Sequence, residues 1–113
     1  MHSQRELDSV TVSADTETSS FDLFRFVSFS YHVKVSEKSS PVGAKMFLQV
    51  SNDGSDWVDV LDSTLNITNN ATGSSAFLED ADISYRYVRL KFEITSGSFV
   101  ADVWFNGQEG AYA

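Results

Sequence analysis

Apolar and polar residues alternate one by one along four stretches of this chain, and no window carries apolar residues at the spacing of an amphipathic helix. The four stretches are 28–35, 45–50, 87–94 and 98–105. Successive side chains of a β-strand point to opposite faces, so each stretch places most of its apolar residues on one face. One-sided alternation is typical of antiparallel sheets that pack one face against a core. The pattern therefore predicts an all-β protein.

Turn-forming residues separate these stretches at intervals that suit β-hairpins and short loops. The separators lie at 36–44, 52–56, 65–75 and 95–98, and they contain glycine, proline, serine, asparagine or aspartate. Strands at this spacing indicate an antiparallel β-sandwich or barrel. We predict seven or eight strands, at about 7–13, 21–27, 28–35, 44–51, 56–61, 76–79, 85–94 and 99–106.

The length fits a single domain over residues 1–113. We expect residues 1–6 to form an N-terminal arm and residues 107–113 a C-terminal tail. The segment 5–16 alternates weakly, so it could add as an edge strand to its own sheet or to the sheet of a neighbouring molecule.

The composition excludes several kinds of site and partner. The chain has 113 residues and no cysteine, which rules out disulfides, thiolate nucleophiles and cysteine zinc sites. A formal net charge of -8 disfavours nucleic acid and anionic lipid as partners, and no stretch has the length of a membrane span. Residues 1–22 contain no apolar run that could form a signal-peptide core, so we expect no secretion by that route.

The sequence presents no recognisable catalytic constellation. His2 and His32 have no second potential metal ligand nearby in the sequence, and no G-x-S-x-G motif accompanies the serines. We interpret His32 as an exposed strand residue. The prediction is a protein that is not an enzyme and uses no cofactor.

Two groups of acidic residues raise the question of a calcium ion. Asp53, Asp56 and Asp59 lack the loop length and the bidentate glutamate of an EF-hand. We interpret this segment as a hairpin turn in which Asp53 and Gly54 supply positive φ angles. The second group, at 79–82, is interpreted as a solvated bend. No metal site is predicted.

Aromatic residues are numerous, with nine Phe, four Tyr and two Trp. Strand alternation places Phe47, Tyr87 and Trp104 on faces opposite to the core. Exposed aromatic patches favour a protein partner or a platform for sugars. The alternative is that a helix-free core simply uses large residues and leaves the remainder near its rim. We take Phe47, Tyr87, Arg89 and Trp104 as the candidate interaction surface.

Two motifs carry a resemblance to a known family. The first is S-N-D-G-S-D-W at 51–57 and the second is R-Y-V-R at 86–89. Together they resemble discoidin-like, galactose-binding-like domains over residues 46–94. The resemblance implies a jelly-roll β-sandwich in which Asp53 and Gly54 close a hairpin and Trp57 covers one end of the core. The cysteines and the greater length that are usual in that family are missing here, and its ligand-binding loops have no match.

Short cysteine-free chains with these motifs also look like small structural proteins of tailed bacteriophages. This resemblance implies a capsid decoration or cement subunit that binds a major capsid protein or another virion protein non-covalently. It also implies a homo-oligomer, with a trimer favoured, that assembles into the virion in the host cytoplasm. The alternative function is a carbohydrate-binding module with outward Trp57, Tyr87 or Trp104.

Overall fold

The fold is all-β, as the alternation predicts. The computed structural model describes residues 2–24, 26–39, 41–68, 75–80 and 85–109, and this part of the chain contains strands and no helix. In this part no helix of membrane-spanning length and hydropathy occurs. The strands are β1 (His2–Val12), β2 (Thr16–Glu17), β3 (Phe21–Asp22), β4 (Phe26–Ser36), β5 (Gly43–Ser51), β6 (Val58–Thr68), β7 (Ser75–Asp80), β8 (Tyr87–Ser96) and β9 (Phe99–Glu109).

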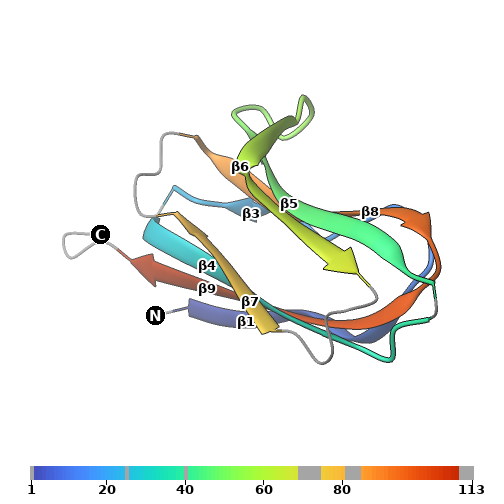
Figure 1. Cartoon of the computed structure of the whole chain (residues 1–113). Coiled ribbons are helices and arrows are strands. Elements are labelled where there is room, and N and C mark those ends of the chain that lie inside the picture. The colour runs from blue at the N-terminus through green and yellow to red at the C-terminus, as the bar shows by residue number, and fades with distance from the viewer. Residues whose placement is uncertain (1, 25, 40, 69–74, 81–84, 110–113) are drawn as a thin grey trace.

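Two antiparallel sheets face each other and form a sandwich (Figure 1). One sheet has the order β1-β9-β4-β7, and the other has the order β2-β8-β5-β6. The short strand β3 also pairs with β8, so β2 and β3 together occupy one edge position. With that position counted once, the eight strands have the order of a jelly roll, which confirms the predicted fold class.

The core consists of the residues that the alternation places inward. Tyr31, Val33, Val103 and Phe105 of the first sheet are fully buried, and so is Leu90 of the second. Phe105 lies at the centre of an aromatic cluster. Its ring stacks on Phe21 at 3.9 Å between centroids, and it meets Phe26, Phe29 and Tyr31 at 5.3–6.1 Å. Burial of these large rings stabilises the sandwich through the hydrophobic effect and through ring–ring contacts.

The predicted N-terminal arm is wrong, because residues 2–6 belong to β1. This strand pairs with β9 from His2, opposite Gly107, to Val12, opposite Phe99. Residues 107–109 of the predicted tail likewise belong to β9, and residues 110–113 lie outside the described part. Strand β1 is therefore an edge strand of the molecule's own sheet. A polar edge strand has little alternation to detect, and the partner that holds it is about 100 residues away along the chain.

Three predicted boundaries also shift. The expected strand 21–27 is interrupted after Asp22 by a turn, and β4 begins at Phe26. The expected strand 56–61 begins at Val58 and extends to Thr68, into the segment 65–75 that composition predicted to be a loop. Residues 79–80, expected in a bend, end strand β7. These strands continue through polar residues because their backbone groups hydrogen-bond to a neighbouring strand. Such bonds do not require an apolar side chain.

Candidate functional site

The four residues of the predicted interaction surface lie on two different sides of the sandwich. Tyr87, Arg89 and Phe47 belong to β8 and β5, on the outer side of the sheet β2-β8-β5-β6. Trp104 belongs to β9, on the outer side of the other sheet. We call the first of these surfaces the β5–β8 face. Its described members are Lys45, Phe47, Gln49, Asp59, Tyr87, Arg89, Lys91 and Glu93, together with Trp57, whose ring contacts Arg89.

A chain of polar contacts crosses the middle of the β5–β8 face. Sheet register places Gln49 of β5 beside Arg89 of β8 on one side and Asp59 of β6 on the other. Arg89 Nε donates to Gln49 Oε1 at 2.8 Å, and Gln49 Nε2 donates to Asp59 Oδ1 at 2.7 Å. Gln49 is only 6% exposed, so its amide is fixed between the two charged groups. The row therefore presents the guanidinium of Arg89 as a donor on one side of Gln49 and the carboxylate of Asp59 as an acceptor on the other.

Trp57 lies next to this row. The guanidinium of Arg89 is 4.2 Å from the centroid of the Trp57 ring, which is a close cation–π contact. Trp57 is half-buried and is not among the residues that form or line the hydrophobic core. The expectation that Trp57 covers one end of the core is therefore corrected. Its ring is part of the outer face, and Arg89 rather than the core holds it.

The loop between β5 and β6 positions Trp57. Asp53 Oδ1 accepts hydrogen bonds from the backbone N–H groups of Ser55 and Asp56, each at 2.8 Å, and from the Ser51 hydroxyl at 2.9 Å. The N–H donors of Asp56 and Ser55 lower the pKa of Asp53 to about 2. Gly54 has a φ of +78°, as predicted.

Two details of this loop differ from the expectation. Asp53 does not share the positive φ of Gly54, and the connection between β5 and β6 spans residues 52–57, whereas the turn was predicted at 52–56. The Asp53 carboxylate accepts hydrogen bonds from residues 51–56 of its own loop. These bonds stabilise a longer loop, so the Asp-Gly pair does not form a tight hairpin here. In the part of the chain that the structure describes, no group of three or more acidic or histidine side chains could hold a metal ion.

A second group of contacts lies at the end of the face. Arg86 Nη2 donates to Asp22 Oδ2 at 3.1 Å, and its guanidinium is 5.3 Å from the ring of Tyr87. Asp22 Oδ1 also accepts the backbone N–H of Phe24 at 3.0 Å. These two bonds lower the pKa of Asp22, with the Arg86 bond contributing most. Asp22 thereby anchors a loop whose tip, Phe24, is 82% exposed.

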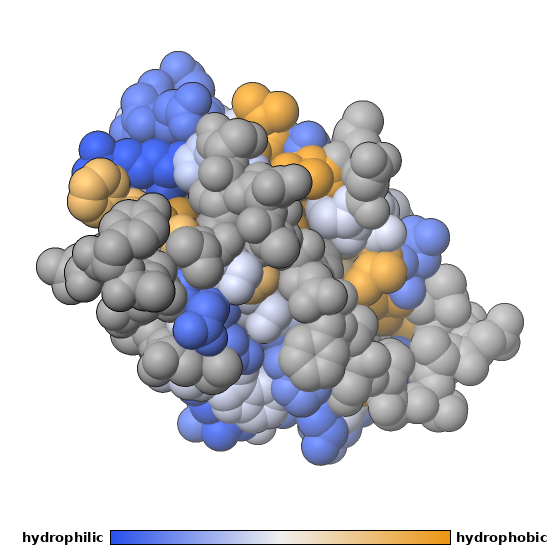
Figure 2. All heavy atoms as spheres, turned by 90° about the vertical axis from the view of Figure 1, so that its left-hand side faces the viewer, coloured by the Kyte–Doolittle hydropathy of each residue, from blue (hydrophilic) through white to orange (hydrophobic). Residues whose placement is uncertain are grey.

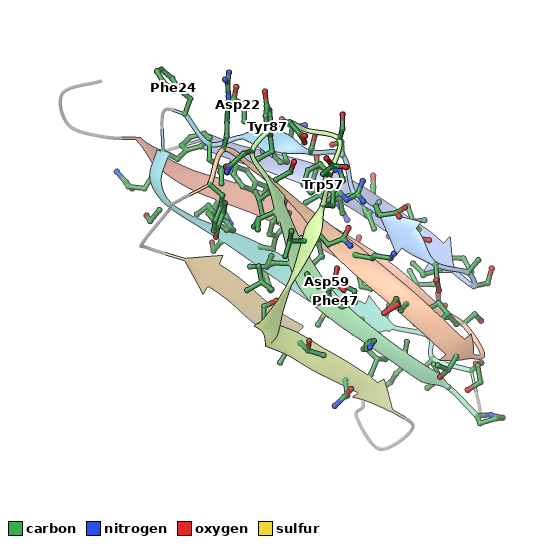
Figure 3. All side chains as sticks on the ribbon, turned by 90° about the horizontal axis from the view of Figure 1, so that it is seen from above. Asp22, Phe24, Phe47, Trp57, Asp59 and Tyr87 are labelled. Atoms are coloured by element: carbon green, nitrogen blue, oxygen red, sulfur yellow. The ribbon has the colours of Figure 1, made fainter. Side chains whose placement is uncertain are left out.

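The aromatic side chains follow one another along this surface. Figure 3 shows that Phe24, Asp22, Tyr87 and Trp57 lie in this spatial order from one end of the sheet toward its middle, where Asp59 lies. Seen from the end of the sandwich, hydrophobic atoms form separate patches among hydrophilic ones (Figure 2). On the β5–β8 face, the register places Tyr87 next to Arg89 along β8, and the Arg89 guanidinium lies between the Trp57 ring and the Gln49 amide.

Phe47 is a correction to the predicted surface, because its side chain is buried at 3% exposure. The β5–β6 ladder shifts register there: Leu48 pairs with Val60, whereas Met46 pairs with Leu65. Residues 61–64 of β6 thus stand where a regular ladder would place one residue. Ser63 closes the bulge by accepting the Leu48 N–H at 2.8 Å and donating to the Val60 carbonyl at 2.5 Å. An exposed Phe47 ring is therefore excluded.

Trp104 occupies the opposite side of the molecule in a different setting. Its ring stacks on His32, with 5.1 Å between centroids, and the Arg5 guanidinium lies 4.9 Å from it. Arg5 also contacts the carboxylate of Asp102, whose pKa is lowered mainly by this bond. His32 is thus half-buried against Trp104, rather than an exposed strand residue. On this side of the molecule, Trp104 is therefore packed against His32 and Arg5, and Arg5 is in turn fixed by Asp102.

A pocket opens beside the 52–57 loop. Its volume is about 350 Å³, and its lining combines apolar and polar side chains. The described lining residues are Val50, Ser51, Asn52, Asp53, Asp56, Val58 and Tyr85. Val58 at this rim is 64% exposed. The pocket adjoins the same loop that holds Trp57.

Two members of the site, Gln49 and Asp59, were not among the residues of the predicted interaction surface, and Asp59 was considered only as a possible calcium ligand. Alternation places Gln49 on the same side as Phe47, and it could have been considered on that ground. Its partners depend on how β5 aligns with β6 and β8. A single sequence contains no signal for that register.

No family model matches the chain, and no curated protein matches it. A solved structure described as "CBM4 structure and function" is similar with a TM-score of 0.43 and 13% identity. The match covers 79% of this chain and 56% of that one, so the present chain spans little more than half its length. This likeness assigns no role to any residue here.

Proposed function

We propose that this protein is a non-catalytic carbohydrate-binding module whose ligand lies along the β5–β8 face. The observation that carries the proposal is the row of Phe24, Tyr87 and Trp57 beside the polar chain Arg89–Gln49–Asp59. Sugar rings have apolar faces that pack on aromatic rings and hydroxyls that both donate and accept hydrogen bonds. A mixed face of this kind offers both types of contact at once.

The carboxyl groups of Asp22 and Asp53 act as hydrogen-bond acceptors in the structure, which suits a role in holding the site. A glycosidase needs one carboxyl group with a raised pKa to protonate the leaving oxygen. Hydrogen bonds instead lower the pKa values of Asp22 and Asp53. Asp59 is committed to the Gln49 amide. These acids are suited to hold side chains and to accept hydrogen bonds from a ligand.

The test is a panel of soluble polysaccharides measured by affinity electrophoresis and titration calorimetry. Tyr87→Ala should weaken binding of the best ligand by roughly tenfold, the equivalent of about 1.4 kcal/mol for one lost aromatic contact. Trp104→Ala is the matched control, because it removes a half-buried aromatic ring from the opposite sheet. Equal losses in the two variants, or no binding to any polysaccharide, would contradict the proposal.

The virion decoration role remains a second candidate. The observation that favours it is the surface around Trp104, where an aromatic ring between Arg5 and His32 provides the kind of amphipathic patch that protein partners contact. In this role the protein would bind a capsid or other virion protein and form a homo-oligomer, with a trimer favoured. Its test is particle binding and light scattering, in which Trp104→Ala should be impaired and Tyr87→Ala should not.

A further inference from the structure

Four basic side chains border the β5–β8 face, and three of them are neutralised by a carboxylate. Lys45 pairs with Glu93 at 3.5 Å, Lys91 with Glu17 at 3.9 Å, and Arg86 with Asp22 at 3.1 Å. Arg89 differs from them. Among the carboxylates whose side chains the structure describes, none has an oxygen within 4.0 Å of the side-chain nitrogens of Arg89. Within that set of side chains, Arg89 is thus a cation in the middle of the face without an acidic partner.

The orientation of Arg89 is nevertheless fixed. Its Nε donates to Gln49, and its planar guanidinium lies 4.2 Å from the centroid of the Trp57 ring. Gln49 in turn is held by Asp59. A guanidinium that is stacked and hydrogen-bonded on one side loses little further freedom when it binds a ligand on the other. The contacts with Gln49 and Trp57 explain how Arg89 is positioned. They do not explain why its charge has no carboxylate partner among the described side chains.

The remaining donors of Arg89 identify the ligand chemistry. A guanidinium has five N–H donors, and only the Nε donor has a partner among the described residues. The terminal nitrogens match the two oxygens of a carboxylate in a bidentate pair. We infer that the ligand is an acidic glycan, and that Arg89 binds the carboxylate of a uronic acid whose ring lies beside Trp57 and Tyr87. This inference rests on the proposed carbohydrate-binding function.

The acidity of the whole chain does not oppose such a ligand at short range. The formal net charge is -8, but at physiological ionic strength charges are screened over about 8 Å. Asp59 lies on β6, two strands from Arg89 on β8, which corresponds to roughly 9–10 Å between strand axes. Lys45, Lys91 and Arg86 are paired with carboxylates, and Asp59 accepts a hydrogen bond from Gln49. Because added ions screen the attraction between Arg89 and a ligand carboxylate, binding should weaken when salt is added.

The first experiment uses the unaltered protein and changes only the ligand. Binding of polygalacturonate is compared with binding of the same polymer after reduction of its carboxyl groups to alcohols. Removal of the carboxylates should lower the affinity by about tenfold or more, because a charge-assisted bidentate pair is lost. If both polymers bind equally, the inference is wrong and the proposed function stands. If no polysaccharide in the panel binds, the proposed function itself fails.

The second experiment changes the protein. Arg89→Gln should lose about tenfold in affinity for polygalacturonate, and Arg89→Lys should lose an intermediate amount because it keeps the charge without the fork. Arg5→Gln is the matched control, since it removes an arginine that contacts an aromatic ring, Trp104, on the opposite sheet and is already paired with Asp102. Thermal unfolding of each variant establishes that it is folded. Equal effects of Arg89→Gln and Arg5→Gln would reduce the inference to general charge attraction and overturn it.

A sulfated polymer distinguishes the kind of anion. Dextran sulfate carries more charge than polygalacturonate but no planar carboxylate. Weaker binding of dextran sulfate, with little dependence on Arg89, is expected. Stronger binding of dextran sulfate that Arg89→Gln leaves unchanged would identify nonspecific polyanion binding and overturn the inference.

Discussion

Removal of the Trp57 side chain tests how this ring is held. If Trp57 sealed the core, Trp57→Ala would cost about 3–5 kcal/mol of unfolding free energy, as buried Trp→Ala changes do. The ring is half-buried and outside the core cluster, so we expect roughly half of that, about 2 kcal/mol. Part of this amount belongs to the contact with Arg89. A partly desolvated cation–π contact contributes about 0.5–2 kcal/mol.

A double-mutant cycle with Trp57→Ala, Arg89→Gln and the combined variant separates these contributions. Urea unfolding can be followed by the fluorescence of Trp104, the tryptophan that remains in all three variants. The coupling energy should be about 0.5–2 kcal/mol, with Trp57→Ala and Arg89→Gln less than additive. A Trp57→Ala cost above 3 kcal/mol with no coupling would refute the reasoning and restore the core position that the sequence suggested.

Phe105→Ala should lower the free energy of unfolding in urea by about 3–5 kcal/mol, because Phe105 is fully buried. Trp104 precedes it on the outer side of the same strand, so Trp104→Ala should cost about half as much or less. Equal costs would contradict the assigned strand faces. Gly54→Ala should cost about 1–2 kcal/mol, because φ is +78° and only ordinary contacts surround an added Cβ, and Gly54→Asn should cost less. The pKa of Asp53 is depressed to about 2, so its contribution to stability is present above the unfolded pKa of about 4 and is lost as the pH falls toward 2; Asp53→Ala should flatten the unfolding curve against pH in that window. Deletion of residues 1–12 should unfold the domain, as monitored by circular dichroism, because it removes one of the two strands that pair with β9. A folded truncated chain would show that β1 is dispensable.

The sandwich was predictable because its inward residues follow a period of two. Phe29, Tyr31 and Val33 share one face in the sequence, and all three are buried in the structure. This burial depends on the local pattern and needs no knowledge of the partner strand. The resemblance of the 51–57 and 86–89 motifs to jelly-roll domains implied the same fold, and the strand order has that topology.

The parts that were missed depend on pairing between distant segments. Residues 2–6 form a strand because β9 supplies their hydrogen bonds, and nothing in their composition shows it. Phe47 is buried at the point where the β5–β6 ladder shifts register, and such a shift leaves no mark in the alternation of β5. For the site, alternation identified Tyr87 and Arg89 as outward residues. The alignment of Arg89 with Gln49 and Asp59 required the register of three strands.

The separation of the two outer faces gives the functional hypotheses independent readouts. Packed sheets lie about 10 Å apart, so a substitution at Tyr87 and one at Trp104 should act independently of each other. Glycan binding that depends on Tyr87 alone would support the carbohydrate-binding module and leave the Trp104 face without a role. Particle binding that depends on Trp104, together with glycan binding that depends on Tyr87, would mean that one sandwich attaches to an assembly by one sheet and presents a glycan-binding surface on the other. The jelly roll permits this combination because each sheet has an outer side of its own.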